Sequence, residues 1–322
     1  MSRARELADS YTDNEVDSKP TGFKNHIING GFDVWQRGTS FSTIGYTADR
    51  WNMVVLNGCT VYSSTSGATV DGTTTNILRI TNSTGLSQDV VLRQPIEAGI
   101  LQGREVTFSA EVRGLGAEVS TVYNRTRGTT NDHINLNVPA TILNPGFTRL
   151  TGTATVPLNS AYTSVYKHDI DINVTIPNGV SFDIAQVQLE EGSVATPFEQ
   201  RPYGLELSLC QRYYEVITVE DNSYLGQYSS AANIFFGSTL HYSVTKRVGP
   251  SVIYSYISGT QYWVIAGQQP FSESTSANIQ LSATQDSVRL RQTRTAGGSS
   301  TPTSGNLYLF EPTFKLLVSA EL

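Results

Sequence analysis

The sequence is poor in charged residues and in cysteine. Asp, Glu, Lys and Arg make up 16% of the 322 residues, whereas about a quarter is usual in soluble proteins. The net charge is −6 and no basic stripe is present, so we expect no binding to nucleic acid, which requires neutralisation of phosphates. The two cysteines, Cys59 and Cys210, are too few for a disulfide framework, and we predict that both are buried thiols.

The sequence also lacks the marks of membrane and exported proteins. No apolar run approaches the roughly 20 residues that cross a bilayer, so we expect no membrane insertion. Residues 1–20 are polar and charged, without the apolar core of a secretory signal peptide. We therefore expect synthesis in the cytoplasm without a signal peptide.

Metal and catalytic motifs are missing as well. The histidines are dispersed without the spacing of metal ligands, so we expect no metal ion and no other cofactor. They are His26, His133, His168 and His241. There is no Gly-x-Ser-x-Gly elbow and no phosphate-binding glycine loop before a helix. The adjacent acids Glu190 and Glu191 would face opposite sides of a strand, so they could not flank one glycosidic bond. A strand-end turn explains them better, and we predict that the protein is not an enzyme.

Small polar residues, 27 glycines, 16 tyrosines and 12 phenylalanines are present instead, a mixture typical of short strands and polar turns. The segment from Val106 to Val112 alternates apolar and polar residues, which predicts a strand with one buried face. We predict further strands in similar runs, which are 51–62, 77–81, 89–96, 134–138, 150–156, 170–176 and 180–189. This pattern predicts an all-β protein with an antiparallel β-sandwich of the jelly-roll type.

The order of these features predicts four parts. One stretch has a helical period, with Leu205, Leu209 and Tyr213 at i, i+4 and i+8 after Pro202. The predicted parts are an N-terminal attachment segment (1–24), a jelly roll (25–202), a connector helix (203–216) and a smaller C-terminal β head domain (217–322).

Three stretches resemble a known family. Residues 25–38 read NHIINGGFDVWQRG and are followed by YTADRW at 46–51. Residues 182–215 read FDIAQVQLEEGSVATPFEQRPYGLELSLCQRYYE, and residues 1–9 read MSRARELAD. Together they resemble bacteriophage and prophage tail-fibre (receptor-binding) proteins with a jelly roll like that of carbohydrate-binding modules. The resemblance covers about the first two-thirds of the chain.

The resemblance implies a structural protein of the virion tail that recognises the host surface. Its partners would be two further copies of itself in a homotrimer, tail or baseplate proteins, and a glycan or protein on the host cell. Four residues of the short amphipathic N-terminal segment are the attachment candidates: Arg3, Arg5, Leu7 and Tyr11. The alternative function is a polysaccharide-binding module or a depolymerase that acts on host-surface glycans.

In related sugar-binding modules the first and last strands lie side by side and can hold a structural calcium. Asp33 and Asp183 lie near those strands here, but Ala185 stands where a second carboxylate is often found. Because calcium requires six to eight oxygen ligands, we expect no calcium site. Trp35 and Trp51 are expected to lie in the core rather than to form a sugar platform.

The C-terminal part holds the better aromatic candidates. Residues 251–266, SVIYSYISGTQYWVIA, predict a hairpin that turns at Ser258 and Gly259 and is apolar on both faces. One core covers only one face of a surface sheet, so the other face needs another sheet of the chain, another subunit or a ligand. We take four of its residues as candidates for receptor binding or for the trimer interface: Tyr254, Tyr256, Tyr262 and Trp263.

Overall fold

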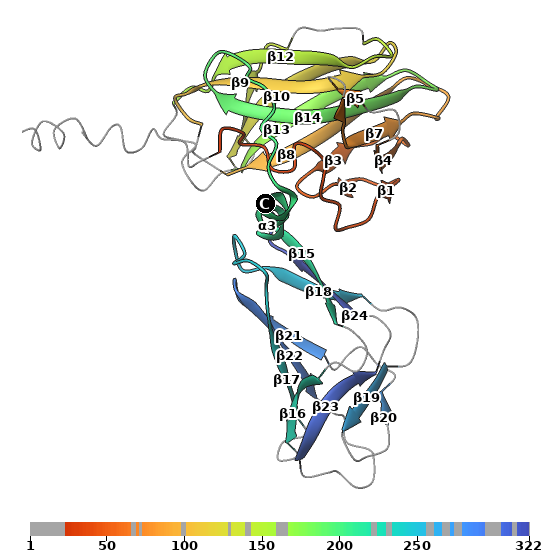
Figure 1. Ribbon diagram of the computed structural model, residues 1–322, viewed down its shortest axis with the longest axis vertical. Coiled ribbons are helices and arrows are strands. Elements are labelled where there is room, and N and C mark those ends of the chain that lie inside the picture. The colour runs from red at the N-terminus through yellow and green to blue at the C-terminus, as the bar shows by residue number, and fades with distance from the viewer. Residues whose placement is uncertain are drawn as a thin grey trace, which may run out of the picture. The chain divides into compact units, whose positions relative to one another are not determined.

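The computed structural model of the chain is mostly antiparallel β structure (Figure 1). The residues that it describes are 23–65, 69–70, 73–97, 101–127, 130–138, 143–158, 167–219, 224–229, 234–255, 261–265, 271–273, 279–293, 304–310 and 314–321. Contacts divide the chain into two compact units, Met1–Arg201 and Pro202–Leu322. The prediction of an all-β antiparallel sandwich is confirmed, whereas the attachment candidates Arg3, Arg5, Leu7 and Tyr11 lie outside the described residues.

The first unit is a sandwich of two six-stranded sheets. In spatial order, sheet A consists of β1 (Ser40–Phe41), β4 (Thr60–Ser64), β7 (Ile77–Thr81), β14 (Ser181–Glu191), β9 (Glu105–Arg113) and β12 (Thr148–Thr155). Sheet B consists of β11 (Thr130–Asn135), β10 (Glu118–Arg127), β13 (Lys167–Ile176), β8 (Gln88–Ile96), β3 (Asn52–Val55) and β2 (Gly45–Tyr46). Two short strands, β5 (Thr69–Val70) and β6 (Thr73–Thr74), pair with each other. From β7 to β10 the chain passes from one sheet to the other at every step, so strands adjacent in sequence lie in opposite layers.

The two sheets enclose one apolar core, to which both layers contribute. Trp51 is fully buried there, with its ring centroid 5.3 Å from that of Phe32. Its Nε1 donates a hydrogen bond of 2.9 Å to the carbonyl of Asn29, which satisfies the one polar group of the indole. Trp35 is partly buried and packs against the same core. Both tryptophans therefore serve the core, as the sequence predicts.

Strand β9 departs from its prediction in one respect. Its apolar residues, from Val106 to Val112, point into the core as the alternation predicts. The polar residues between them, Thr107, Ser109 and Glu111, are also buried. Thr107 shows the reason, because its hydroxyl donates 2.6 Å to the carbonyl of Gly192, in the segment that follows β14. The segment that follows β14 thus covers β9 on the outer face of sheet A.

The predicted strand over residues 51–62 is wrong. The run is divided into β3 in sheet B and β4 in sheet A, separated by a turn at Asn57 and Gly58. Both turn residues have positive φ, 46° and 79°, a conformation that Asn and Gly adopt most readily. The turn lets the chain cross from one layer to the other and carry apolar residues into both.

The second unit begins with the helix α3 (Tyr203–Gln211). A three-stranded sheet consists of β15 (Tyr214–Val219), β24 (Phe314–Ser319) and β18 (Ser251–Ser255). A seven-stranded sheet consists of β20 (Phe271–Glu273), β19 (Gln261–Ile265), β23 (Ser304–Phe310), β16 (Tyr224–Ser229), β17 (Ile234–His241), β22 (Ser287–Thr293) and β21 (Ile279–Ala283). The helix is shorter than the predicted 203–216, because the residues from Tyr214 onward pair with β24 instead.

The predicted aromatic hairpin of residues 251–266 is wrong. Strand β18 pairs with β24 in the three-stranded sheet, whereas β19 pairs with β20 and β23 in the seven-stranded sheet. Each half of the apolar run pairs with strands outside the run, so the two halves do not pair with each other. The residue Tyr256 and the side chains of Tyr254, Tyr262 and Trp263 lie outside the described part of the chain.

Cys59 and Cys210 are buried and form no disulfide, as predicted, and burial raises the pKa of the Cys59 thiol. Within the described ranges, no helix has the length and apolar character needed to span a membrane.

Candidate functional site

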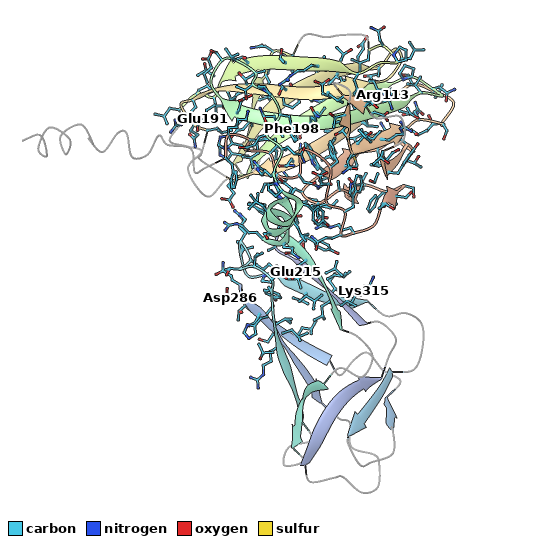
Figure 2. The ribbon with its side chains drawn as sticks, in the orientation of Figure 1. Arg113, Glu191, Phe198, Glu215, Asp286 and Lys315 are labelled. Carbon is cyan, nitrogen blue, oxygen red and sulfur yellow. The ribbon has the colours of Figure 1, made fainter. Side chains whose placement is uncertain are left out.

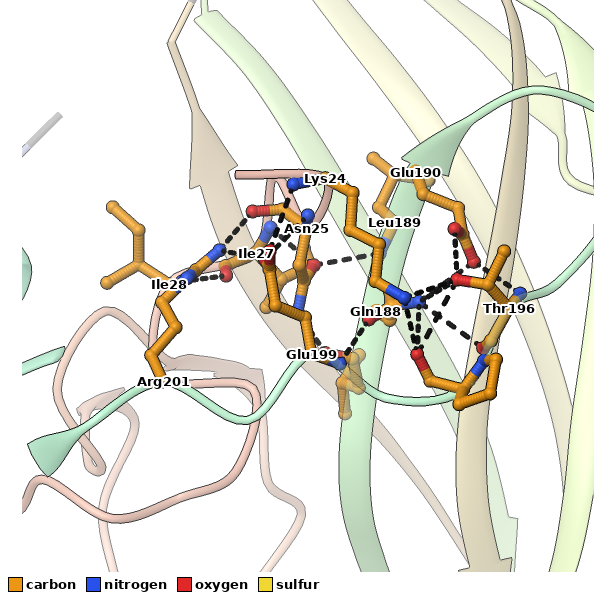
Figure 3. Close-up of polar contacts among 12 residues, drawn as sticks. Lys24, Asn25, Ile27, Ile28, Gln188, Leu189, Glu190, Thr196, Glu199 and Arg201 are labelled. Atoms are coloured by element: carbon orange, nitrogen blue, oxygen red, sulfur yellow. Dashed lines mark hydrogen bonds and ion pairs between the residues drawn. The ribbon is translucent and has the colours of Figure 1, made fainter. Parts of the chain in front are cut away.

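Two stretches that are far apart in the sequence, 25–38 and 182–215, contact each other through hydrogen bonds (Figure 3). The buried Asn25 side chain bonds three backbone groups: its Nδ2 donates to Val187 O at 3.1 Å, and its Oδ1 accepts from Ile27 N at 2.9 Å and Leu189 N at 3.1 Å. Arg201 donates to the carbonyls of Ile27, at 3.1 Å, and of Asn25. We call these five residues the clasp. It ties the beginning of the jelly roll to its end, so its side chains are committed to the fold.

The segment after β14 continues this closure across sheet A. Glu190 is buried and accepts hydrogen bonds from Thr196 N at 2.8 Å and Thr196 Oγ1 at 2.6 Å. Gln188 Nε2 donates to Glu190 at 2.8 Å, and Gln188 Oε1 accepts from Glu199 N at 2.8 Å. Glu191 bonds elsewhere, with Arg104 Nη1 at 2.9 Å. The two adjacent glutamates thus have separate structural partners at the end of a strand, as the sequence predicts.

The other end of this face is occupied by an ion-pair cluster. Arg113 and Glu191 lie at opposite ends of this face (Figure 2). Asp183 is buried, and its carboxylate accepts from Arg79 Nε at 2.5 Å, Arg79 Nη2 at 2.7 Å and Arg113 Nε at 2.7 Å. The Arg113 guanidinium lies 4.6 Å from the centroid of the Phe147 ring. Asp33 has different partners and accepts 2.6 Å from Asn76 Nδ2. Both carboxylate oxygens of Asp183 thus accept hydrogen bonds from arginines. Among the described residues, no group of three side chains that could hold a metal ion occurs.

The outer face of sheet B is buried at one end, where Asn124, Asp169 and Asp171 lie, and exposed at the other. Its centre is a polar network built on Asp171, whose carboxylate accepts from Arg93 Nε at 2.6 Å and Arg93 Nη2 at 2.7 Å. Asn124 Nδ2 donates to the same carboxylate at 2.6 Å, and the exposed His133 bonds Asn124 Oδ1 through Nδ1. Asp169 lies on the same face, two residues before Asp171, with its Oδ2 4.0 Å from Arg93 Nη1. This network orients side chains from β8, β13, β10 and β11 across the sheet.

A hollow of about 330 Å³ lies on this face, on the three adjacent strands β10, β13 and β8. This volume is within the range of roughly 300–1,000 Å³ that small-molecule sites occupy. The cross-strand register places its outward side chains in two rows. The first row is Glu118, Thr175 and Asp89, and the second row is Ser120, Asn173 and Val91.

The polar groups of the hollow differ from those over sheet A in their hydrogen bonding. Thr175 Oγ1 donates to Asp89 Oδ1 at 2.6 Å. Within the described part of the chain, the side chains of Glu118, Ser120 and Asn173 make no hydrogen bond, and Glu118 and Ser120 are exposed. Three polar side chains are therefore available to a ligand at the same place. We take this hollow as the candidate site.

The residues of the hollow were not among the candidates from the sequence. They come from three strands separated by dozens of residues, and no local motif joins them. A signal existed in β13, where Asp169, Asp171, Asn173 and Thr175 alternate with buried apolar residues. Such alternation predicts a strand with one polar face, although it does not distinguish a binding face from a solvated one.

A further cluster of buried charges lies in the second unit. Lys246 Nζ donates to Gln211 O at 2.6 Å and to Glu215 Oε2 at 2.5 Å, and it lies 4.8 Å from the centroid of the Tyr242 ring. Burial lowers the pKa of Lys246 against the opposing effect of Glu215, and burial raises the pKa of Tyr242 to about 12. The cluster joins the end of α3 to β15, so its role is structural.

No family model matches the chain, and no curated protein matches its sequence. Three similar solved structures each overlap about half of the chain. The enzymatically active domain of bacteriophage CBA120 tailspike protein 4 is 16% identical over 52% of this chain and 21% of its own, with a TM-score of 0.37. TmCBM61 in complex with beta-1,4-galactotriose is 12% identical over 53% of this chain and 100% of its own, with a TM-score of 0.34. A cyclase from Fischerella sp. TAU is 16% identical over 54% of this chain and 100% of its own, with a TM-score of 0.36. Likenesses this distant assign neither a ligand nor an activity.

Proposed function

We propose that the protein is a non-enzymatic attachment protein of a bacteriophage tail and that its jelly roll binds a host-surface glycan in the hollow on sheet B. The resemblance of residues 25–51 and 182–215 to phage tail-fibre proteins supports the phage assignment. The clasp contains residues of both stretches and joins the beginning of the jelly roll to its end. The observation that carries glycan binding is the contrast between the two faces. Over β14 of sheet A, Gln188, Glu190 and Thr196 bond one another. The side chains of Glu118, Ser120 and Asn173 in the hollow have no bonding partner among the described residues.

The chemistry of the hollow suits a sugar. Sugar hydroxyls both donate and accept hydrogen bonds, and amides, hydroxyls and carboxylates complement them. Asn173 supplies two donors and an acceptor, while the carboxylates of Asp89 and Glu118 accept only. Val91 adds an apolar contact for the C–H groups of a sugar ring. A homotrimer would present three such sites, and multivalency can raise avidity by 10²–10⁴ when the geometry allows, so a weak single site suffices for adhesion.

The remaining partners follow from the same proposal. The N-terminal segment docks on tail or baseplate proteins, and the finished protein resides in the virion. The aromatic candidates of the second unit contribute to receptor contact or to trimer assembly, and they are tested by single substitutions to Ser at Tyr254, Tyr256, Tyr262 and Trp263. At least one variant should stay folded and lose adsorption or assembly. If every variant either unfolds or behaves like the parent, these side chains have no such role.

Glycan binding is tested by calorimetry with polysaccharides from host cell surfaces and the full chain. Asn173→Ala removes up to three hydrogen bonds of about 1 kcal/mol each, so we expect affinity to fall by roughly fivefold or more. Thr151→Ala is the matched control, because Thr151 is exposed on β12 of sheet A. Equal affinity in both variants, or no binding to any host polysaccharide, would refute the proposed site. Immunogold labelling of phage particles tests the virion location independently.

A further inference from the structure

The arrangement of donors and acceptors in the hollow indicates which sugars it accepts. We propose that the hollow selects amino sugars and rejects sugars that carry a carboxylate, phosphate or sulfate group. The proposal rests on the proposed glycan-binding function and deepens it by naming the ligand class.

The first row of the hollow is a line of acceptors. The carboxylates of Glu118 and Asp89 cannot donate. Thr175 lies between them in the register and donates its one proton to Asp89 at 2.6 Å, so its oxygen is left with lone pairs. All three side chains of this row therefore require a donor from the ligand. An ammonium group satisfies this requirement better than a hydroxyl, because it carries three donors and no acceptor.

The spacing of the row fits a group placed between its ends. Neighbouring strands lie about 4.8 Å apart, so the backbones of Glu118 on β10 and Asp89 on β8 are about 10 Å apart. Thr175 on β13 lies midway. A ligand substituent at this row would therefore lie above Thr175, with Glu118 on one side of it and Asp89 on the other.

The second row orients the rest of the sugar ring. Asn173 and Ser120 supply the donors that the first row lacks, and neither side chain has another partner in the described part of the chain. They can bond the ring hydroxyls, while Val91 contacts the ring itself. The two rows thus differ in chemistry, which gives the sugar one preferred orientation, with its nitrogen toward Glu118 and Asp89.

The same lining disfavours anionic sugars. None of the residues that form the hollow is Lys, Arg or His. A ligand carboxylate or phosphate in the hollow would lie close to the carboxylates of Asp89 and Glu118, with no cation among the lining residues. The like charges would repel each other. Acceptors would also face acceptors, so the polar groups on both sides would lose their water without forming hydrogen bonds.

The test measures the affinity of the full chain for three tetrasaccharides, composed of glucosamine, glucose or glucuronic acid. We expect the glucosamine tetrasaccharide to bind at least tenfold more tightly than the glucose tetrasaccharide, and the glucuronic acid tetrasaccharide to bind most weakly. Asp89→Asn and Glu118→Gln should each reduce the preference for glucosamine at least threefold. Glu105→Gln is the control, because Glu105 is exposed on β9 of sheet A and its substitution changes the net charge equally.

The outcomes separate the two proposals. If all three sugars bind with the same affinity, or the acidic sugar binds best, and Asn173→Ala still weakens binding, the amino-sugar inference is wrong while the binding site stands. If Glu105→Gln reduces the preference as much as Glu118→Gln does, the effect is one of net charge and the inference is wrong. If no sugar binds, or Asn173→Ala has no effect, the proposed site fails and the inference fails with it.

Discussion

Removal of the Asn25 side chain should strongly destabilise the jelly roll. The side chain is buried and makes three hydrogen bonds, with Ile27 N, Val187 O and Leu189 N. Each contributes about 1 kcal/mol, and a buried group left without a partner costs about 1–3 kcal/mol. We therefore expect Asn25→Ala to lower the free energy of unfolding by about 3–5 kcal/mol.

Urea denaturation followed by tryptophan fluorescence measures this loss. A Trp263→Phe background restricts the signal to Trp35 and Trp51, which are both in the first unit, and so avoids a composite transition. For a domain of about 200 residues, 1 kcal/mol shifts Tm by about 2–4 °C, so Tm should fall by roughly 10 °C.

Asn178→Ala is the matched control for Asn25→Ala. Its side chain makes one exposed hydrogen bond, accepting 2.8 Å from Gly85 N, and surface substitutions usually change stability by less than about 0.5 kcal/mol. If Asn25→Ala costs no more than Asn178→Ala, the two stretches do not depend on each other for stability, and the reasoning from the clasp is refuted.

Three further predictions concern pH, attachment and chemistry. Burial lowers the pKa of His26 below 6.5, with an opposing effect from Glu191. The folded state therefore binds a proton on His26 less readily than the unfolded state does. The contribution of His26 to the free energy of unfolding is full above pH 6.5 and is lost as pH falls from 6.5 through the lower pKa of the folded state. His26→Gln should flatten the pH dependence of unfolding between pH 7 and 5, whereas the exposed His241→Gln should not; equal slopes in all three proteins would contradict this. Deletion of residues 1–22 should leave the urea midpoint unchanged and abolish incorporation into phage particles, and normal incorporation of the shortened chain would disprove the attachment role. The full chain should release no reducing ends from capsule or lipopolysaccharide, and turnover that one Asp or Glu substitution removes would identify an enzyme.

The strands were predictable from the sequence where one local period decides them. Alternation from Val106 to Val112 is enough to place β9, because side chains on a strand alternate between faces. That the second face of β9 is buried depends on the contact of Thr107 with Gly192, which no local pattern contains. The division of residues 51–62 was marked by Asn57 and Gly58, a pair typical of tight turns, but apolar residues on both sides made the run resemble a single strand.

The candidate site could not be predicted in the same way. Its two rows form only when β10, β13 and β8 lie side by side, and the pairing of Ser120 with Asn173 and of Asn173 with Val91 is a property of the register. A shift by one residue would turn these side chains into the core. The polar face of β13 was visible as alternation, yet the partners that make it a hollow lie on other strands.

The two stretches that the clasp joins and the residues of the hollow belong to different parts of the jelly roll. Asn25 and Arg201 bond backbone groups of the clasp, and Glu190 bonds the covering segment at Thr196. These contacts are determined by the closure of the fold and leave no group for a ligand. Glu118 and Asn173 lie outside the resembling stretches, and their substitution would not disturb the clasp. Proteins that share the two stretches should therefore share the closure of the jelly roll while differing in ligand, because the residues that define the fold are separate from those that would bind.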